Sequence, residues 1–246
     1  MDRRWSIVFV ATLAILYGLG IFWGLPSALS AASDSTAPLG PLSFVADYRD
    51  PNKSYIYPAV HQLLLVSVYA VILVGCKLFG YLGSLSSSWP YGFSDPTTVF
   101  SAFILGSNLV SLVMGIFMLL LLKRIRPTKS YVPLVPMLLI GTSGVFAYYA
   151  RVANLDVPYL FWWMLSFVFL WRFLFSGEPR RKFLMLSATA AALAIGTKDQ
   201  SAGLILGFGL VVMFIQPPGA NDVGWLGRFK NTIIFSVTLI AVYGRC

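Results

Sequence analysis

The sequence is poor in charged residues and in the residue types that build most soluble sites. Only 11% of the 246 residues are charged, and the chain has one histidine and two cysteines. An ordinary soluble domain has about a quarter of its residues charged, so this composition excludes that class. Cys76 and Cys246 lack metal-ligand spacing, and they support neither a disulfide framework nor a zinc site.

The sequence also lacks the short motifs of several enzyme classes. There is no glycine-rich phosphate loop of Walker or Rossmann spacing and no Gly-x-Ser-x-Gly nucleophile elbow. Nucleotide hydrolysis and serine esterase chemistry therefore have no support. The internal repeats that are common in transporters are not visible either.

Long apolar runs dominate what is present. Hydrophobic residues make up 58% of the chain, and the mean hydropathy is +0.78. Runs of about 18 to 24 apolar residues are long enough to cross the hydrocarbon core of a bilayer as helices. The pattern predicts an all-α, polytopic transmembrane helical bundle of about seven or eight membrane segments. The expected segments are residues 5–24, 59–82, 99–122, 131–149, 157–175, 182–197, 201–216 and 230–244.

Basic clusters lie next to these runs. The net charge is +9, and the clusters are "MDRR", "KRIRPTK" and "EPRRK". Such clusters usually follow the positive-inside rule, which favours membrane topology over nucleic-acid binding as their explanation. The first apolar run is too long for the core of a signal peptide, and we interpret it as a retained signal anchor.

The charge rule also predicts on which side the polar junctions lie. If "KRIRPTK" and "EPRRK" are cytoplasmic, the two segments between them cross out and back, and the junction between those segments is external. One of the runs 59–82 and 99–122 then does not fully span, and we expect the first to be re-entrant or to lie at the interface. The charged residues expected together on the external side are Asp34, Arg151, Asp156 and Lys198.

The longest polar-leaning connection spans residues 25–58, and we expect it to be an external acidic loop. It is far longer than a helix-to-helix turn needs, and loops of this kind tend to be functional. Within it, Asp34 could act as general base toward an acceptor hydroxyl. The alternatives are a solvated loop aspartate or the N-cap of a short helix.

Arg151 and Asp156 interrupt the apolar stretch "YYARVANLDVPYLFWW". A charged side chain at the centre of a bilayer costs roughly 2.5 to 3.5 kcal/mol on insertion scales, so the pair marks a membrane edge or a function. Asp156 could cap the following helix, and Arg151 could extend from a helix end to the headgroups. In a site, the pair would supply a second acid and a cation for a phosphate oxygen.

A polar turn interrupts the last long apolar stretch. Lys198 and Asp199 divide a run from Phe183 to Ile215 that is too long for one crossing, so topology requires a turn there. Lys198 could also meet a phosphate as a point charge. His61, the only histidine, begins the second apolar run, where hydrogen bonding at the interface explains it as well as a site does.

The order of these motifs resembles that of the lipid-dependent GT-C glycosyltransferases, especially the relatives of protein O-mannosyltransferases and of the aminoarabinose transferase that modifies lipid A. The resemblance covers about residues 5–216 and rests on the first-loop acid, "YIYPAVHQLL", "YYARVANLDVPYLFWW", "LWRF" and "AIGTKDQSAG". It implies transfer of a sugar from a polyprenyl-phosphate donor to a hydroxyl of a protein, lipid or glycan acceptor at the external or lumenal face.

The resemblance also implies roles for individual residues. Asp34 matches the first-loop acid, the proposed base, and Asp156 matches the second acidic position. Arg151 and Lys198 would bind the donor phosphate. Such a reaction needs one base for the hydroxyl and cations for the departing phosphate. Further residues expected to line the site are Tyr57, His61 and Asp199.

Departures from the family pattern bear on metals and on the extent of the chain. Asp34-Ser35 stands where many relatives have an Asp-Glu pair, and Tyr55-Ile56-Tyr57 replaces a charged residue. We therefore expect no divalent metal and no other cofactor. Residues 1–246 are expected to form one transmembrane module, cut short at its C-terminus, that need not be active alone. We expect it in a bacterial or archaeal plasma membrane or in the ER membrane.

Two other classes fit parts of the pattern. In a transporter or lipid flippase, Arg151, Asp156 and Lys198 would line a substrate path. In a non-catalytic assembly subunit, the same charges would only pair helices. The long acidic first loop favours an external active site over a transport path.

Overall fold

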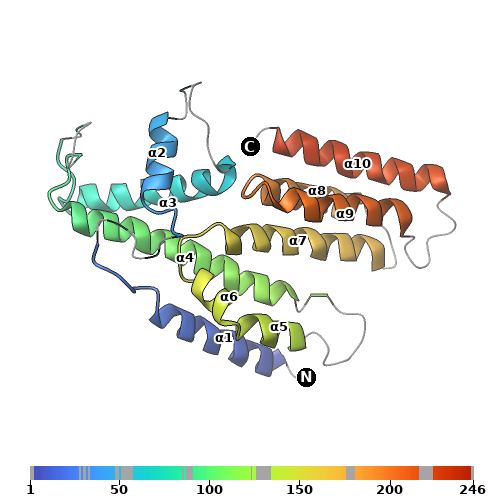
Figure 1. The fold of residues 1–246 in the computed structure, drawn as a ribbon, viewed down its shortest axis with the longest axis horizontal. Helices are drawn as coiled ribbons and strands as arrows, with labels where there is room; N and C mark the ends of the chain where they lie inside the picture. Colours follow the sequence, from blue (N-terminus) through green and yellow to red (C-terminus); the bar gives the residue numbers. More distant parts are fainter. Residues whose placement is uncertain are drawn as a thin grey trace.

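A computed structural model gives the fold of the chain and describes residues 3–27, 29, 32, 34–47, 50, 58–84, 86, 91–122, 124–125, 134–175, 181–215 and 224–244. Within these residues the chain is all-α, as predicted, and an isolated bridge between Leu82 and Phe93 is the extent of β-structure. The helices are α1 (Arg3–Leu19), α2 (Leu39–Asp47), α3 (Ala59–Leu78), α4 (Pro96–Leu122), α5 (Leu134–Gly141), α6 (Gly144–Tyr149), α7 (Asp156–Phe175), α8 (Arg181–Ile195), α9 (Ser201–Phe214) and α10 (Trp225–Tyr243) (Figure 1).

Three of these helices are long and apolar enough to cross a membrane. They are α3 with 20 residues, α4 with 27 and α7 with 20. Shorter apolar helices cover Ile7–Leu19 and Ser201–Phe214. The long helices indicate a multi-pass membrane protein, while the predicted total of seven or eight segments stays a prediction.

Two expected segments differ from their predicted form. The run 131–149 is not one helix but two, because the backbone of Ser143 is extended, with φ −64° and ψ 127°. The α1 helix packs at this break: a Cβ on Gly141 would lie 2.5 Å from Cδ1 of Leu13, and the hydroxyl of Tyr17 donates to the carbonyl of Gly141. The first loop contains α2, which begins at Leu39, so Asp34 does not cap that helix.

The α4 helix is the central element, and its two halves pack against different partners. On the first half, Phe103 stacks on Tyr69 of α3 with ring centroids 4.3 Å apart, and Ser107 hydrogen-bonds the Tyr69 hydroxyl at 2.8 Å. On the second half, Gly115 lies against Val157 of α7. Figure 1 shows the result: α3 and α7 run along opposite halves of α4.

Among the described helices, α7 and α8 pack against each other most extensively, and small polar and alanine side chains of α8 are buried in this contact. The Ser166 hydroxyl donates to the Ser187 carbonyl at 2.8 Å, and the Ser187 hydroxyl donates to the Ser166 carbonyl at 2.9 Å. Both serines are fully buried. Small residues allow close helix approach where lipid removes the hydrophobic driving force for association. This pair therefore fixes the end of α8 against the start of α7.

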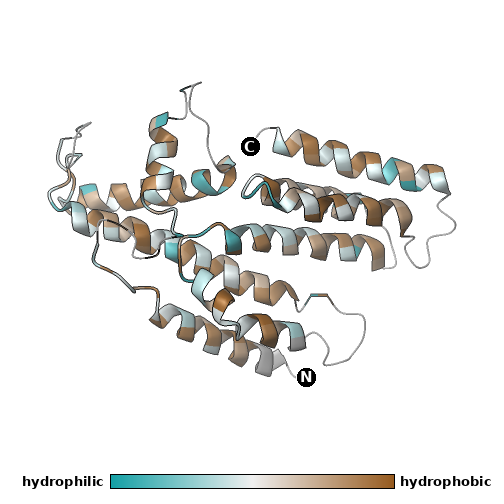
Figure 2. Cartoon of the chain, viewed as in Figure 1, coloured by the Kyte–Doolittle hydropathy of each residue, from teal (hydrophilic) through white to brown (hydrophobic). Residues whose placement is uncertain are grey.

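The starts of α3 and α7 meet the turn between α8 and α9. The amide of Val60 donates to the carbonyl of Gly196 at 2.9 Å, which fastens the start of α3 to that turn. Figure 2 shows hydrophilic residues gathered at this level, at the beginning of α7 and along the α8–α9 turn, with apolar helices around them. The starts of two helices and the α8–α9 turn, three separate segments, thus come together.

Candidate functional site

The first loop is held against the segment that precedes α7. The amide and the hydroxyl of Thr36 both donate to the carbonyl of Ala153, at 2.8 and 3.1 Å. The side-chain amide of Asn154 donates to the carbonyl of Asp34 at 3.1 Å. These bonds fix Asp34 beside the start of α7, although the two segments are about 120 residues apart in the chain.

Asn154, and not Asp156, satisfies the first amide of α7. The Oδ1 atom of Asn154 accepts a hydrogen bond from the amide of Asp156 at 2.7 Å, and α7 begins at Asp156. The predicted cap at Asp156 is therefore wrong by two positions. The Asp156 carboxylate lies in the first turn instead, where the helix dipole favours a negative charge.

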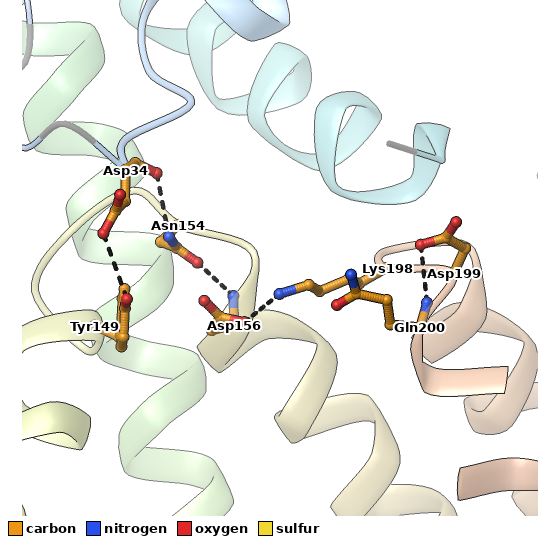
Figure 3. Close-up of polar contacts among 7 residues, drawn as sticks. All are labelled: Asp34, Tyr149, Asn154, Asp156, Lys198, Asp199 and Gln200. Carbon is orange, nitrogen blue, oxygen red and sulfur yellow. Dashed lines mark hydrogen bonds and ion pairs between the residues drawn. The ribbon is translucent and has the colours of Figure 1, made fainter. Parts of the chain in front are cut away.

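Lys198 reaches Asp156 from the α8–α9 turn. Its Nζ atom lies 2.5 Å from Oδ1 of Asp156, and both side chains are partly buried, with 18% and 29% of their surfaces exposed. The same ammonium lies 5.4 Å from the ring centroid of Tyr159. Figure 3 shows Asp156 and Lys198 facing one another from α7 and from the turn. The ion pair directs the lysine toward the first loop.

These residues line a cavity of about 460 Å³, which we call the acidic cavity. It brings together Asp34, Asp156 and Lys198, three of the residues that the sequence nominated. Its lining is Asp34, Ser35, Thr36, Tyr149, Asn154, Leu155, Asp156 and Lys198. Two carboxylates, one cation and several hydroxyl groups in one cavity suit a hydroxyl nucleophile and a phosphate leaving group.

Tyr149 provides a hydroxyl at the edge of this cavity. Its phenol donates to Oδ2 of Asp34 at 3.4 Å (Figure 3). The negative charge of Asp34 raises the pKa of Tyr149 above its ordinary value of 10.0, and desolvation and Asp156 act in the same direction. The phenol is therefore a neutral hydrogen-bond donor near pH 7.

An apolar groove of about 640 Å³ adjoins the acidic cavity and shares Tyr149 and Asp156 with it. Its other lining residues come from α4, α5, α6 and α7 and the short segment joining α5 to α6, and most are apolar or aromatic: Met118, Leu139, Ile140, Ser143, Val145, Phe146, Val157, Tyr159, Leu160, Trp163 and Met164. A polar cavity joined to an apolar groove suits an amphiphilic ligand with a polar head and a hydrocarbon chain.

The remaining nominated residues lie elsewhere. Arg151 lines a separate cavity of about 560 Å³, which we call the arginine cavity. Asp199 is exposed and accepts a hydrogen bond from the amide of Gln200 at 2.8 Å; Figure 3 shows it turned away from Asp156. His61 is buried in α3, and neither ring nitrogen has a hydrogen-bond partner among the described residues. Tyr57 lies outside the described residues.

The described part of the chain contains no group of three His, Cys, Asp or Glu side chains that could hold a metal ion. In the acidic cavity the carboxylates are Asp34 and Asp156, and Asp156 already pairs with Lys198. The expectation that the reaction uses no metal stays a prediction.

Sequence reasoning missed Asn154 and Tyr149. Asn154 lies in "NLDVP", where the sequence alone indicates only a turn. Its bond to the Asp156 amide is local, whereas its bond to the carbonyl of Asp34 depends on the first loop arriving from far away in the sequence. Tyr149 belongs to an aromatic-rich stretch, where a single tyrosine gives no signal. In the sequence, the polar residues Arg151 and Asn154 just before Asp156 are the one local indication of a site here.

The long apolar helices around a polar cavity indicate a multi-pass membrane protein with a candidate site at the ends of its helices. The chain belongs to the dolichyl-phosphate-mannose-protein mannosyltransferase family, a GT-C glycosyltransferase family, whose profile matches residues 46–242. No curated protein and no solved structure matches the chain. The matched range contains Arg151, Asp156 and Lys198, whereas Asp34 precedes it.

Proposed function

We propose that the chain is a multi-pass membrane mannosyltransferase that moves mannose from dolichyl-phosphate mannose, or a related polyprenyl-phosphate donor, to a hydroxyl of a protein acceptor. The family supports the donor and the acceptor class. The observation that carries the proposal for this chain is the acidic cavity, in which Asp34, Asp156 and Lys198 lie beside an apolar groove. We place the reaction at the external or lumenal face, where the charge rule predicts that these residues lie.

The residues suit a direct displacement at the anomeric carbon. The acceptor oxygen bonds to that carbon while the bond to the phosphate oxygen breaks, and the polyprenyl phosphate leaves with the electron pair. Asp34 takes the proton of the acceptor hydroxyl. Lys198, oriented by Asp156, stabilises the negative charge on the leaving phosphate.

The apolar groove suits the first part of the polyprenyl chain. It adjoins the acidic cavity at Tyr149 and Asp156, so a lipid in the groove would present its phosphate near Lys198. Arg151 faces the arginine cavity, and the proposal therefore assigns the reacting phosphate to Lys198 alone.

Reconstitution with radiolabelled polyprenyl-phosphate mannose tests the function. The full chain in lipid vesicles is given an acceptor peptide rich in serine and threonine, and Asp34→Asn is compared with the wild type. Removal of a general base lowers the rate by roughly 10²- to 10⁴-fold. Asp199→Asn is the matched control, because Asp199 is an exposed carboxylate outside the cavity.

Two outcomes contradict the proposal. Transfer that survives Asp34→Asn unchanged removes the assignment of Asp34 as the base. Counterflow of the labelled lipid without transfer, dependent on Lys198, would instead favour a lipid transporter.

A further inference from the structure

The guanidinium of Arg151 lines the arginine cavity and does not line the acidic cavity. The lining of the arginine cavity combines Arg151 and Asn108 with apolar and aromatic residues from the end of α1 and the turn that follows it, including Phe22 and Trp23 in that turn. Tyr148 lines the arginine cavity and Tyr149 the acidic cavity, with ring centroids 5.0 Å apart. The two cavities are neighbours separated by this pair of rings.

The partly buried side chain of Arg151 lies across Gly20. A Cβ atom placed on Gly20 would lie 2.4 Å from Nη1 and 2.9 Å from Cδ of Arg151. Glycine at position 20 therefore makes room for the arginine side chain. Among the described residues, no carboxylate forms an ion pair with Arg151. An ionisable side chain at a membrane edge with no opposite charge beside it is a candidate for binding a charged ligand.

Asn108 supplies a second polar group to the same cavity. It is 6% exposed, and its side-chain amide donates to the carbonyl of Ile21 at 3.2 Å. Its Oδ1 atom has no hydrogen-bond partner among the described residues. A buried acceptor of this kind needs a hydrogen-bond donor, and leaving it unsatisfied is unfavourable.

The walls of the cavity suit lipid chains. Leu19, Phe22 and Trp23 are each more than 60% exposed, at 76%, 62% and 62%. In a bilayer these side chains lie against hydrocarbon, and tryptophan favours the depth of the headgroups. The guanidinium of Arg151 lies beside these side chains, and a guanidinium can donate two parallel hydrogen bonds to one phosphate group.

We propose that the arginine cavity binds the headgroup of one bilayer phospholipid, with its phosphate on Arg151 and a headgroup hydroxyl or ammonium donating to Asn108. Basic pockets between membrane helices bind lipid headgroups in this manner. A polyprenyl phosphate without its sugar offers a phosphate but no hydroxyl or ammonium beyond it, so a glycerol or ethanolamine headgroup fits Asn108 better than the free carrier lipid does. The bound lipid would hold the end of α1 against α4 and the segment that carries Asn154.

Native mass spectrometry of the full chain released from detergent tests this site. The lipids added are phosphatidylglycerol, phosphatidylethanolamine, phosphatidylcholine, polyprenyl phosphate and diacylglycerol. Wild type should retain one molecule of phosphatidylglycerol or phosphatidylethanolamine and should not retain diacylglycerol, which has no phosphate. Arg151→Gln should lower the retained fraction about tenfold or more, because it removes a charge-assisted pair.

Two further variants keep the test decisive if Arg151→Gln folds poorly. Gly20→Ala should displace the flexible end of Arg151 and lower retention in the same way, without removing the charge. Asn108→Leu should abolish the preference for phosphatidylglycerol and phosphatidylethanolamine over phosphatidylcholine. Arg172→Gln is the control, since Arg172 lies on α7 over the ring of Phe183, at 5.8 Å, and does not line the cavity.

The readout separates this site from the transferase reaction, because binding is measured without a sugar donor. Retention that is equal in wild type, Arg151→Gln and Gly20→Ala would overturn the proposal, as would equal retention of diacylglycerol. Stronger binding of polyprenyl phosphate than of every phospholipid, lost in Arg151→Gln, would also overturn it. The cavity would then hold the carrier lipid.

Discussion

Asn154 connects the two acids of the candidate site through the two ends of one side-chain amide. Its Nδ2 atom donates to the carbonyl of Asp34, and its Oδ1 atom accepts a hydrogen bond from the amide of Asp156. The residue is 8% exposed, so water does not readily replace either bond. A catalytic arrangement tolerates errors of about 0.5 Å, which makes such a link important for the rate.

Asn154→Ala should therefore lower the transfer rate by about 10- to 100-fold, because a misplaced reacting group costs about that much. The donor lipid should still bind, since Lys198 and the apolar groove are unchanged. Single-turnover rates and donor binding, measured separately in vesicles, check this. Asp199→Asn should leave both values at the wild-type level, and loss of donor binding in Asn154→Ala would contradict a positioning role.

Tyr149→Phe should have a smaller effect, about threefold to tenfold on the rate, since it removes one long hydrogen bond to Asp34. The raised pKa of Tyr149 sets the pH dependence. The folded chain favours the protonated phenol, so the hydrogen bond is fully present below pH 10 and is lost as the pH rises through the raised value. Rates of the wild type and the variant should stay in constant ratio between about pH 6 and 9. A ratio that changes within that range would contradict a neutral phenol.

Helix positions follow from the sequence because apolar run length is a local property. The runs near 59–82, 99–122 and 157–175 coincide with α3, α4 and α7, the helices long enough to span. The break between α5 and α6 could not be predicted in this way. At this break Tyr17 of α1 donates to the carbonyl of Gly141, a contact between residues 124 positions apart that run length does not reveal.

The candidate site was predictable in its charged residues and unpredictable in its geometry. Charges inside apolar sequence stand out, and Asp34, Asp156 and Lys198 do lie along one cavity. The separate position of Arg151 depends on Gly20, whose missing side chain admits the arginine. His61 illustrates a false indication from the sequence. As the only histidine it is an obvious candidate, but its ring is buried and does not line the acidic cavity.

At the level of elements, the α7–α8 contact positions Asp156 relative to Lys198, and its stability can be tested through Ser187. Ser187→Ala should lower stability only slightly, since hydrogen bonds between membrane helices average about 0.6 kcal/mol. Ser187→Leu should cost about 1 to 3 kcal/mol, because it overpacks a fully buried contact. Thermal unfolding in detergent measures both. Equal effects of the two variants would contradict close packing at this position.

The whole molecule is organised by the opposite directions in which α3 and α7 leave the site. Tyr69 of α3 packs at Phe103 in the first half of α4, whereas Val157 of α7 packs at Gly115 in the second half. Both α3 and α7 have 20 residues and are long enough to cross a bilayer. Because they extend along different halves of α4, a bilayer centred on α7 would not be centred on α3. This arrangement favours an interfacial or re-entrant α3.

Single cysteines in a chain with Cys76 and Cys246 replaced by serine test this topology. Lys182 and Asp199 are exposed and lie at opposite ends of α8, whose 15 residues extend about 22 Å. A membrane-impermeant maleimide should label Asp199→Cys in intact cells and label Lys182→Cys only after permeabilisation, since the basic cluster before α8 is cytoplasmic by the charge rule.

Lys77→Cys, near the exposed end of α3, then decides how α3 lies. If α3 extends from the site along the external face, this cysteine should be labelled in intact cells together with Asp199→Cys. Labelling that requires permeabilisation would place this end of α3 on the same side as Lys182, and it would contradict the opposite directions in which α3 and α7 leave the site.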